Sequence, residues 1–117
     1  KSSQMTFDLE CKQKVTENLF QIWYFYASRH DIFYVKENKA TSRLNTHTYT
    51  IDSLESILNQ YGYIRIHRTF LVNCEYIYEL RNDSVILKDG QSLTMSRGRI
   101  DVVKKAYQKM VRERGKI

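Results

Sequence analysis

Four clusters of basic residues in this sequence could hold a polyanion such as nucleic acid. Arginine can donate two parallel hydrogen bonds to guanine or to a phosphate, and histidine can donate to or accept from the edges of bases. A serine hydroxyl adds another hydrogen-bonding group, and a glycine lets the backbone approach a ligand closely. The clusters are Arg29-His30, the stretch Arg65-x-His67-Arg68, the run Ser96-Arg97-Gly98-Arg99, and a basic tail that begins at Lys104 and Lys105.

The first two clusters also have an ordinary structural interpretation. Arg29 and His30 could form a solvated turn, because polar residues are common wherever strands reverse direction. Arg65 could be a solvent-facing residue of an alternating strand, and His67 could be a core histidine that bonds to the backbone. The residue types alone leave these alternatives open.

The charge of the chain is concentrated at its C-terminal end. Residues 1–90 carry equal numbers of basic and acidic side chains, so the net charge of +6 lies within residues 91–117. Such a field attracts polyanions, although a basic helix that only aids solubility would have the same composition. Arg97 and Arg99 could begin that helix, where cations are unfavourable because a helix N-terminus is partially positive. Beside its N–H donors they would favour a bound phosphate.

Signatures of enzymatic chemistry are absent from the sequence. It has no glycine-rich phosphate loop, no helical histidine pair and no GxSxG nucleophile motif. Ser96, His67 and Asp83 could form a triad on paper, but nothing in their spacing brings them together. We therefore expect no enzyme, no catalytic residue, no metal and no cofactor. No apolar run approaches the roughly 18 residues of a membrane span, so no membrane partner is expected.

Short strands dominate the expected secondary structure. Residues 22–27 are a continuous apolar and aromatic run, which is typical of a central strand covered on both faces. An Asp-Gly pair at 89–90 predicts a tight turn. Residues 67–69 interrupt an alternating pattern, which indicates a turn or a corner. The expected strands are 5–9, 15–20, 22–27, 32–36, 40–45, 48–51, 63–66, 76–80, 84–88 and 92–95, and the apolar residues 70–72 are expected to belong to the turn or corner.

Two helices are expected. Asp52 and Glu55 have the spacing of a capping box, apolar residues then repeat at helical spacing, and Gly62 stands where a C-terminal cap belongs. These signals predict a short helix over about 53–60 that covers a sheet. A second apolar repeat predicts a C-terminal helix over about 98–113.

The stretch from Tyr63 to Asn73 resembles the signature of the LytTR-type DNA-binding domain. It reads Tyr-Ile-Arg-Ile-His-Arg-Thr-Phe-Leu-Val-Asn. The usual signature has an aromatic residue, Arg, an apolar residue, His, Arg or Asn, Ser, an aromatic residue, two apolar residues and Asn. The strand over 22–26 and the Ser96-Arg97 pair also stand where the family has them.

This resemblance implies a mainly β fold, an elongated stack of antiparallel sheets with one short helix and a C-terminal helix. Because the resemblance covers about 5–103, we expect the chain, 1–117, to be a single domain with a basic extension over 104–117. It also implies a cytoplasmic transcriptional regulator, the output domain of a bacterial response regulator whose full-length form has a receiver domain. Its partner would be double-stranded promoter DNA with imperfect repeats, bound by two copies of the domain.

In the family, loops enter two successive major grooves, touch the minor groove between them and bend the duplex. The first loop corresponds to about 28–32, with Arg29 or His30 as its reader, and the second to 67–68. In the third loop some members place an arginine where this chain has Gly98, so Arg97 or Arg99 would read there. We expect the three loops to share one edge of the molecule. The implied DNA-binding residues are Arg29, His30, His67, Arg68, Ser96, Arg97 and Arg99, with weaker backbone contacts from Arg65, Lys104 and Lys105.

An RNA-binding or protein-interaction β module is the alternative function. Exposed aromatic rings on strands can stack single-stranded bases. The aromatic run over 22–27 has the pattern of a core strand instead, which favours duplex DNA.

Overall fold

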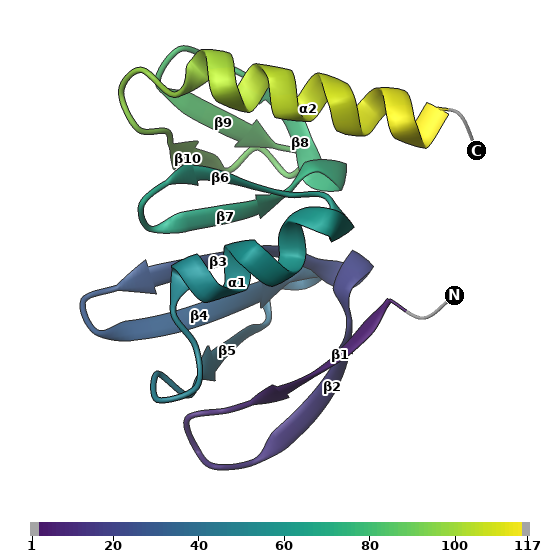
Figure 1. Ribbon diagram of the computed structural model, residues 1–117. Coiled ribbons are helices and arrows are strands. Elements are labelled where there is room, and N and C mark those ends of the chain that lie inside the picture. Colours follow the sequence, from purple (N-terminus) through teal and green to yellow (C-terminus); the bar gives the residue numbers. More distant parts are fainter. Residues whose placement is uncertain (1–2, 116–117) are drawn as a thin grey trace.

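Three antiparallel β-sheets lie one above another in the computed structural model, which describes residues 3–115 (Figure 1). The first sheet pairs β1 (Gln4–Asp8) with β2 (Lys14–Asn18). The middle sheet has five strands in the order β5-β4-β3-β7-β6, and the third has three in the order β10-β9-β8. The described chain measures 38 × 35 × 26 Å along its principal axes.

The strands of the two larger sheets follow the predicted order along the chain, except that residues 70–72, expected in a turn or corner, form the strand β7, which pairs with β3 and β6. The five strands of the middle sheet are β3 (Ile22–Ser28), β4 (Asp31–Lys36), β5 (Thr41–Leu44), β6 (Tyr63–His67) and β7 (Phe70–Asn73). The third sheet consists of β8 (Ile77–Leu80), β9 (Ser84–Leu87) and β10 (Ser92–Thr94). The mainly β fold predicted from the sequence is confirmed.

One predicted strand, over 48–51, is wrong. Thr48 and Tyr49 both donate their backbone N–H to the carbonyl of Asn45, which makes a turn. The ring of Tyr49 is buried, and its hydroxyl accepts the backbone N–H of Asp8. The apolar residue Tyr49 is therefore buried because the turn packs against the first sheet. Ile51 is already the first residue of a helix.

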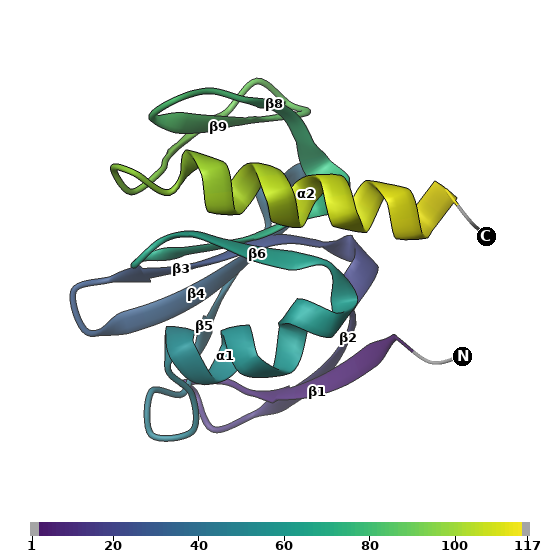
Figure 2. The same ribbon diagram turned by 45° about the horizontal axis from the view of Figure 1, so that its top comes forward.

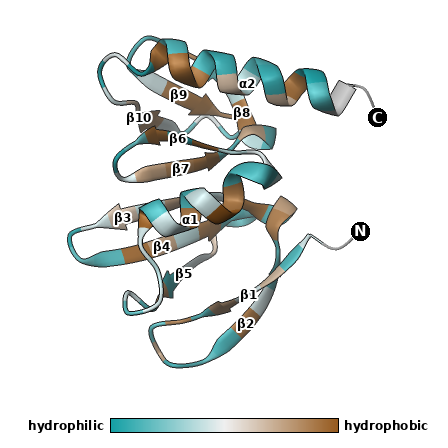
Figure 3. Ribbon diagram, viewed as in Figure 1, coloured by the Kyte–Doolittle hydropathy of each residue, from teal (hydrophilic) through white to brown (hydrophobic). Residues whose placement is uncertain are grey.

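The middle sheet is covered on both faces, as its aromatic central strand predicted. Phe25 of β3 belongs to a buried cluster with Phe7 of β1 and Leu54 of the first helix. Its neighbour Tyr24 belongs to a second cluster, together with Val85 of β9. Successive strand residues point to opposite faces, and each fully buried large apolar side chain contributes about 1.5–3 kcal/mol. Figure 3 shows how apolar residues are distributed over the layers.

The first helix, α1 (Ile51–Leu58), begins two residues earlier than predicted, and its capping box is not the one predicted. Thr50 is the N-cap: its hydroxyl accepts the N–H of Ser53 at 3.0 Å, and the Ser53 hydroxyl accepts the N–H of Thr50 at 2.9 Å. Serine replaces the usual Glu at the fourth position of the box, which hid the motif. The helix continues into a 3-10 turn, and Gly62 ends it at φ 90°, as expected.

The second helix, α2 (Ile100–Gly115), confirms the expected C-terminal helix but begins two residues later. Gly98, at φ 81°, makes a turn before the helix. Arg97 and Arg99 therefore precede the helix, which excludes the alternative that they form its first turn. Val103 is fully buried against the third sheet and the middle sheet.

Candidate nucleic-acid interface

Three loops that carry basic residues project from the same side of the molecule, the left side in Figures 1 and 2. We call them loop 1 (28–31, between β3 and β4), loop 2 (67–70, between β6 and β7) and loop 3 (95–99, between β10 and α2). Their order along the edge follows from the strand order, so loop 2 lies between the other two. The expectation that the three loops share one edge is confirmed.

Backbone hydrogen bonds fix the three loops relative to one another. Ala27 at the end of β3 donates its N–H to the carbonyl of Thr69 in loop 2, at 2.9 Å. Ser96 in loop 3 donates its N–H to the carbonyl of Ile66 on β6, at 2.8 Å. Since both bonds join loop residues to neighbouring strands, the spacing of the loops is built into the sheet rather than left to flexible segments.

Loop 1 is a two-residue turn with Arg29 and His30 at its tip. Ser28 pairs with Asp31 across the hairpin, and both tip side chains are exposed. Arg29 has φ 59°, a left-handed conformation that is uncommon for a residue with a Cβ. Asp31 lies 3.8 Å from the guanidinium of Arg43, which offsets part of its negative charge beside the tip. The turn therefore presents a cation and an imidazole to solvent.

Loop 2 presents Arg68 on a turn that His67 and Thr69 hold closed. Arg68 is exposed, whereas its two neighbours are half-buried. Thr69 donates its backbone N–H to Nδ1 of His67 at 3.1 Å, and its hydroxyl lies 2.8 Å from the same nitrogen. Because Nδ1 accepts the backbone proton, the neutral ring carries its own proton on Nε2. His67 thus closes the turn with one nitrogen and has a donor on the other.

Arg65 lies behind loop 2, and its guanidinium is already occupied. Nη1 is 2.8 Å from a carboxylate oxygen of Asp52 and 2.9 Å from one of Glu55. Nε donates to the carbonyl of His67 and Nη2 to that of Arg68, each at 2.7 Å. The side chain is only 13% exposed. Its predicted contact with a DNA phosphate stays a prediction, but its present hydrogen bonds all lie within the protein.

Of the two arginines of loop 3, one is exposed to solvent and the other is hydrogen-bonded within the protein. Arg97 is exposed beside Gly98, and Ser96 is half-buried. Arg99 is half-buried, and its Nε and Nη2 donate to the carbonyl of Arg65 at 3.2 and 2.9 Å. Of the two candidates for base reading in this loop, Arg97 therefore has the more accessible position.

The basic face of α2 begins directly behind loop 3. Lys104, Lys105, Lys109 and Arg112 are all exposed on the helix. The helix runs away from the edge that carries the loops (Figures 1 and 2). With a rise of about 1.5 Å per residue, Lys105 lies about 7.5 Å along the axis from Ile100, and Arg112 lies about 18 Å along it. Lys104 and Lys105 are thus the basic residues of α2 that are close to the loops.

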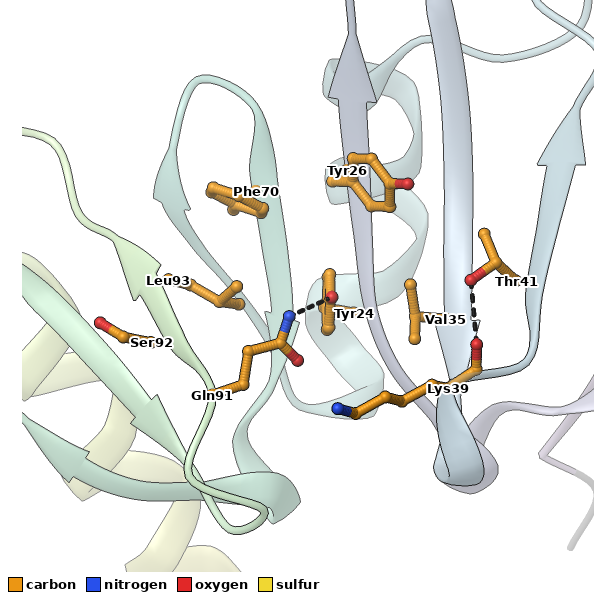
Figure 4. Close-up of a pocket in the computed structure, with 9 residues that line it drawn as sticks. All are labelled: Tyr24, Tyr26, Val35, Lys39, Thr41, Phe70, Gln91, Ser92 and Leu93. Atoms are coloured by element: carbon orange, nitrogen blue, oxygen red, sulfur yellow. Dashed lines mark hydrogen bonds between the residues drawn. The ribbon is translucent and has the colours of Figure 1, made fainter.

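A hollow of about 440 Å³ lies between the middle sheet and β10 and extends to Phe70 at the end of loop 2 (Figure 4). Tyr24 and Phe70 supply aromatic walls, Gln91 donates to the hydroxyl of Tyr24 at 2.9 Å, and Lys39 reaches in from the other side. Its lining includes no histidine and no carboxylate that could act as a general base. Within residues 3–115, no three His, Cys, Asp or Glu side chains are grouped closely enough to hold a metal.

Sequence reasoning missed the role of Asp52 and Glu55. Their spacing matched a helix cap, yet their carboxylates bind Arg65 on a different element. The only available signal was that residues three apart on a helix share a face, which permits a joint partner but does not name it. The partner is decided by how α1 packs beside β6.

Cationic loops on one edge of a rigid β stack, with a basic helix behind them, have the charge distribution of a nucleic-acid-binding module. The family model described as the LytTr DNA-binding domain matches residues 12–108. The chain belongs to the LytTR family of DNA-binding domains, as the motif over 63–73 indicated. Because this is a family of DNA-binding domains, the prediction that the chain is not an enzyme is confirmed.

Two relatives illustrate the similarity. The chain is 33% identical over 78 residues to the sensory transduction protein LytT of Bacillus subtilis (strain 168), a match that covers 57% of this chain and 32% of LytT. It thus spans about a third of that relative's length. The fold matches the LytTr DNA-binding domain of a methyl-accepting/DNA response regulator from Bacillus cereus with a TM-score of 0.73 and 19% identity, covering 91% of this chain and 97% of that one.

Among the described residues, neither helix combines the length and the apolar character that crossing a bilayer requires.

Proposed function

We propose that this domain binds specific double-stranded promoter DNA through loops 1, 2 and 3. The observation that carries the proposal is the location of three cationic loops on one edge, fixed to one another by backbone bonds. Loops 1 and 2 are joined to the strand pairs β4-β3 and β7-β6, so their centres lie about 10 Å apart, two strand spacings. Because this is less than the width of one major groove, about 12 Å, loops 1 and 2 can contact one continuous stretch of a duplex.

The residues at the tips would read bases, and the residues behind them would contact phosphates. Arg68 reads from loop 2, Arg29 or His30 from loop 1, and Arg97 from loop 3, because arginine can form two hydrogen bonds to guanine in the major groove. Nε2 of His67 supplies a donor for a base or a phosphate. Phosphate contacts from other residues, which carry no sequence information, set the position of the domain. They come from Ser96, Lys104 and Lys105.

In the full-length protein the domain would serve as the output part of a bacterial response regulator that controls transcription. Support comes from the family and from the similarity to a sensory transduction protein that is about three times as long as the matched segment. Two copies of the domain would bind imperfect repeats, and a receiver domain would control them. The protein would then act in the cytoplasm, where its promoter DNA lies.

The RNA-binding alternative gains no support from Tyr24 and Phe25 of the aromatic strand. Phe25 is fully buried and Tyr24 is buried between the middle sheet and β9, so neither ring is available to stack on a base.

Substitution of Arg68 tests the proposal. A duplex selected from a random-sequence pool by the unaltered chain serves as the specific probe, and a shuffled duplex of the same length as the non-specific probe. Arg68→Ala should weaken binding of the selected duplex by about 1–3 kcal/mol, or roughly 5- to 150-fold, because it removes a base contact. Fluorescence anisotropy at fixed salt measures both affinities. Equal affinity of Arg68→Ala and the parent for the selected duplex would refute base reading by loop 2.

A further inference from the structure

Asp52 and Glu55 of α1 both bind Arg65, although neither helix residue belongs to a loop. Three residues apart, they share one face of α1, and their carboxylates lie 2.8 and 2.9 Å from the same nitrogen, Nη1. The Arg65 side chain is 13% exposed, whereas those of Asp52 and Glu55 are 87% and 42% exposed, so the bond to Glu55 is the less screened of the two. The two carboxylates fix the direction in which the guanidinium points.

The remaining nitrogens of Arg65 hold the backbone of loop 2. Nε and Nη2 donate to the carbonyls of His67, the last residue of β6, and of Arg68, the first residue of the turn. Hydrogen bonds from a charged donor are stronger than those between neutral groups. The planar guanidinium donates to the carboxylates on one side and to both backbone carbonyls on the other, so it holds the carbonyls in fixed positions. A lysine ammonium lacks this fixed arrangement of donors.

Loop 3 is fastened to the same residue from behind. Arg99 donates two hydrogen bonds to the backbone carbonyl of Arg65, and Ser96 donates one to the carbonyl of Ile66. The side chain of Arg65 therefore holds the backbone of loop 2, while its backbone carbonyl accepts the hydrogen bonds from Arg99 of loop 3.

From these contacts we infer that Asp52 and Glu55 act through Arg65 as positioning residues for sequence-specific DNA binding. The inference rests on the proposed function. It reverses the usual electrostatic expectation, because removal of carboxylates near a DNA-binding edge ordinarily strengthens binding by reducing repulsion of phosphates. Here their removal frees the guanidinium, loosens the loop 2 backbone and misplaces Arg68 relative to the bases.

The test compares two pairs of substitutions that remove equal charge. Asp52→Ala with Glu55→Ala removes the carboxylates that bind Arg65. Glu37→Gln with Asp89→Asn removes two exposed carboxylates at positions away from loop 2, one after the far end of β4 and one in the β9–β10 turn. Both pairs are titrated with the selected and the shuffled duplex, and amide hydrogen exchange of loop 2 is followed by NMR in the free chain.

We expect the Asp52/Glu55 pair to weaken binding of the selected duplex about tenfold, to change binding of the shuffled duplex less than twofold, and to accelerate exchange in loop 2. The control pair should leave selected-duplex binding unchanged or slightly tighter. Parent-like or tighter binding of the selected duplex by the Asp52/Glu55 pair would overturn the inference.

Arg65→Lys separates positioning from a direct phosphate contact. Lysine keeps the positive charge but cannot join two carboxylates to two carbonyls. We expect Arg65→Lys to lose about tenfold in affinity for the selected duplex with an unchanged salt dependence, whereas retention of full affinity would overturn the inference. If the parent chain itself fails to distinguish the two duplexes, the proposed function fails. Amide hydrogen exchange of loop 2 in the Asp52/Glu55 double variant then tests by itself whether the two carboxylates position loop 2, and an unaltered exchange rate refutes that role.

Discussion

The geometry of α2 leads to a prediction about which of its basic residues contribute to DNA binding. Lys104 and Lys105 lie within about 7.5 Å of the start of the helix along its axis, whereas Lys109 and Arg112 lie about 13.5 and 18 Å along it. The Debye length at physiological ionic strength is about 8 Å. Removal of the first pair should therefore weaken binding, and removal of the second pair should have little effect.

The magnitude follows from counterion release. Each phosphate contact contributes about 0.9 to the slope of log affinity against log salt, so Lys104→Ala with Lys105→Ala should lower the slope by about two. If the two contacts contribute nothing at 1 M salt, a slope difference of about 1.8 over one decade means that their removal lowers affinity about 60-fold at 0.1 M salt. This loss applies to the selected and the shuffled duplex alike. Alanine is the best helix former, so α2 should persist.

The assay is a salt titration of both duplexes by fluorescence anisotropy, with circular dichroism to verify the helix. Lys109→Ala with Arg112→Ala is the matched control, because it removes two charges from the same exposed helix. We expect the control to change the slope by less than about 0.5, since most of its field is screened. Equal losses from the two pairs would refute the proposed placement of the duplex along the loop edge.

Two further predictions concern loop 1 and the core. Arg29→Gly should weaken DNA binding yet change the free energy of unfolding by less than about 1 kcal/mol. The reason is that glycine adopts the left-handed conformation at φ 59° without strain, which offsets its greater entropy in the unfolded chain. Urea denaturation measured beside the DNA titration checks this, and a loss of stability above about 2 kcal/mol would contradict it. Burial raises the pKa of Tyr63, whose hydroxyl shares its proton between the carbonyls of Leu19 and Ile22. Above pH 10.0, the ordinary pKa of tyrosine, the unfolded state loses this proton while the folded state keeps it. Stability should therefore fall as pH rises past about 10, by up to about 1.4 kcal/mol per pH unit, and Tyr63→Phe should remove that part of the loss in urea denaturation between pH 8 and 11; an identical pH profile for the variant would exclude Tyr63 as the cause.

Local patterns in the sequence determined most of the strand order. The aromatic run of β3 predicted a central strand because only a strand covered on both faces can bury every residue, and Phe25 and Tyr24 are indeed buried on opposite faces. The Asp-Gly turn, the polar break at about 28–32 and the interruption over 67–69 were equally local, as was the LytTR motif. These features depend on neighbouring residues, whose types and spacing can be read directly.

The helix cap of α1 shows where local patterns become ambiguous. Asp52 and Glu55 fitted the expected residue types better than Thr50 and Ser53, which have the same spacing and form the actual box. Both pairs have side chains that can cap a helix, and the choice depends on where the chain leaves the turn at Asn45. That turn is fixed by the burial of Tyr49, a contact with a distant strand.

The sequence by itself determined the types of the basic residues, their position in breaks between strands and the family to which the chain belongs. Only the tertiary structure decided which arginines are presented to solvent and which hold the loops in place. Arg68 and Arg97 are exposed, while Arg65 and Arg99 donate to carbonyls and carboxylates within the protein. The physical reason is that a guanidinium binds whichever acceptors the fold brings within reach, and for Arg65 two of those acceptors lie on a helix 10 and 13 residues earlier in the chain.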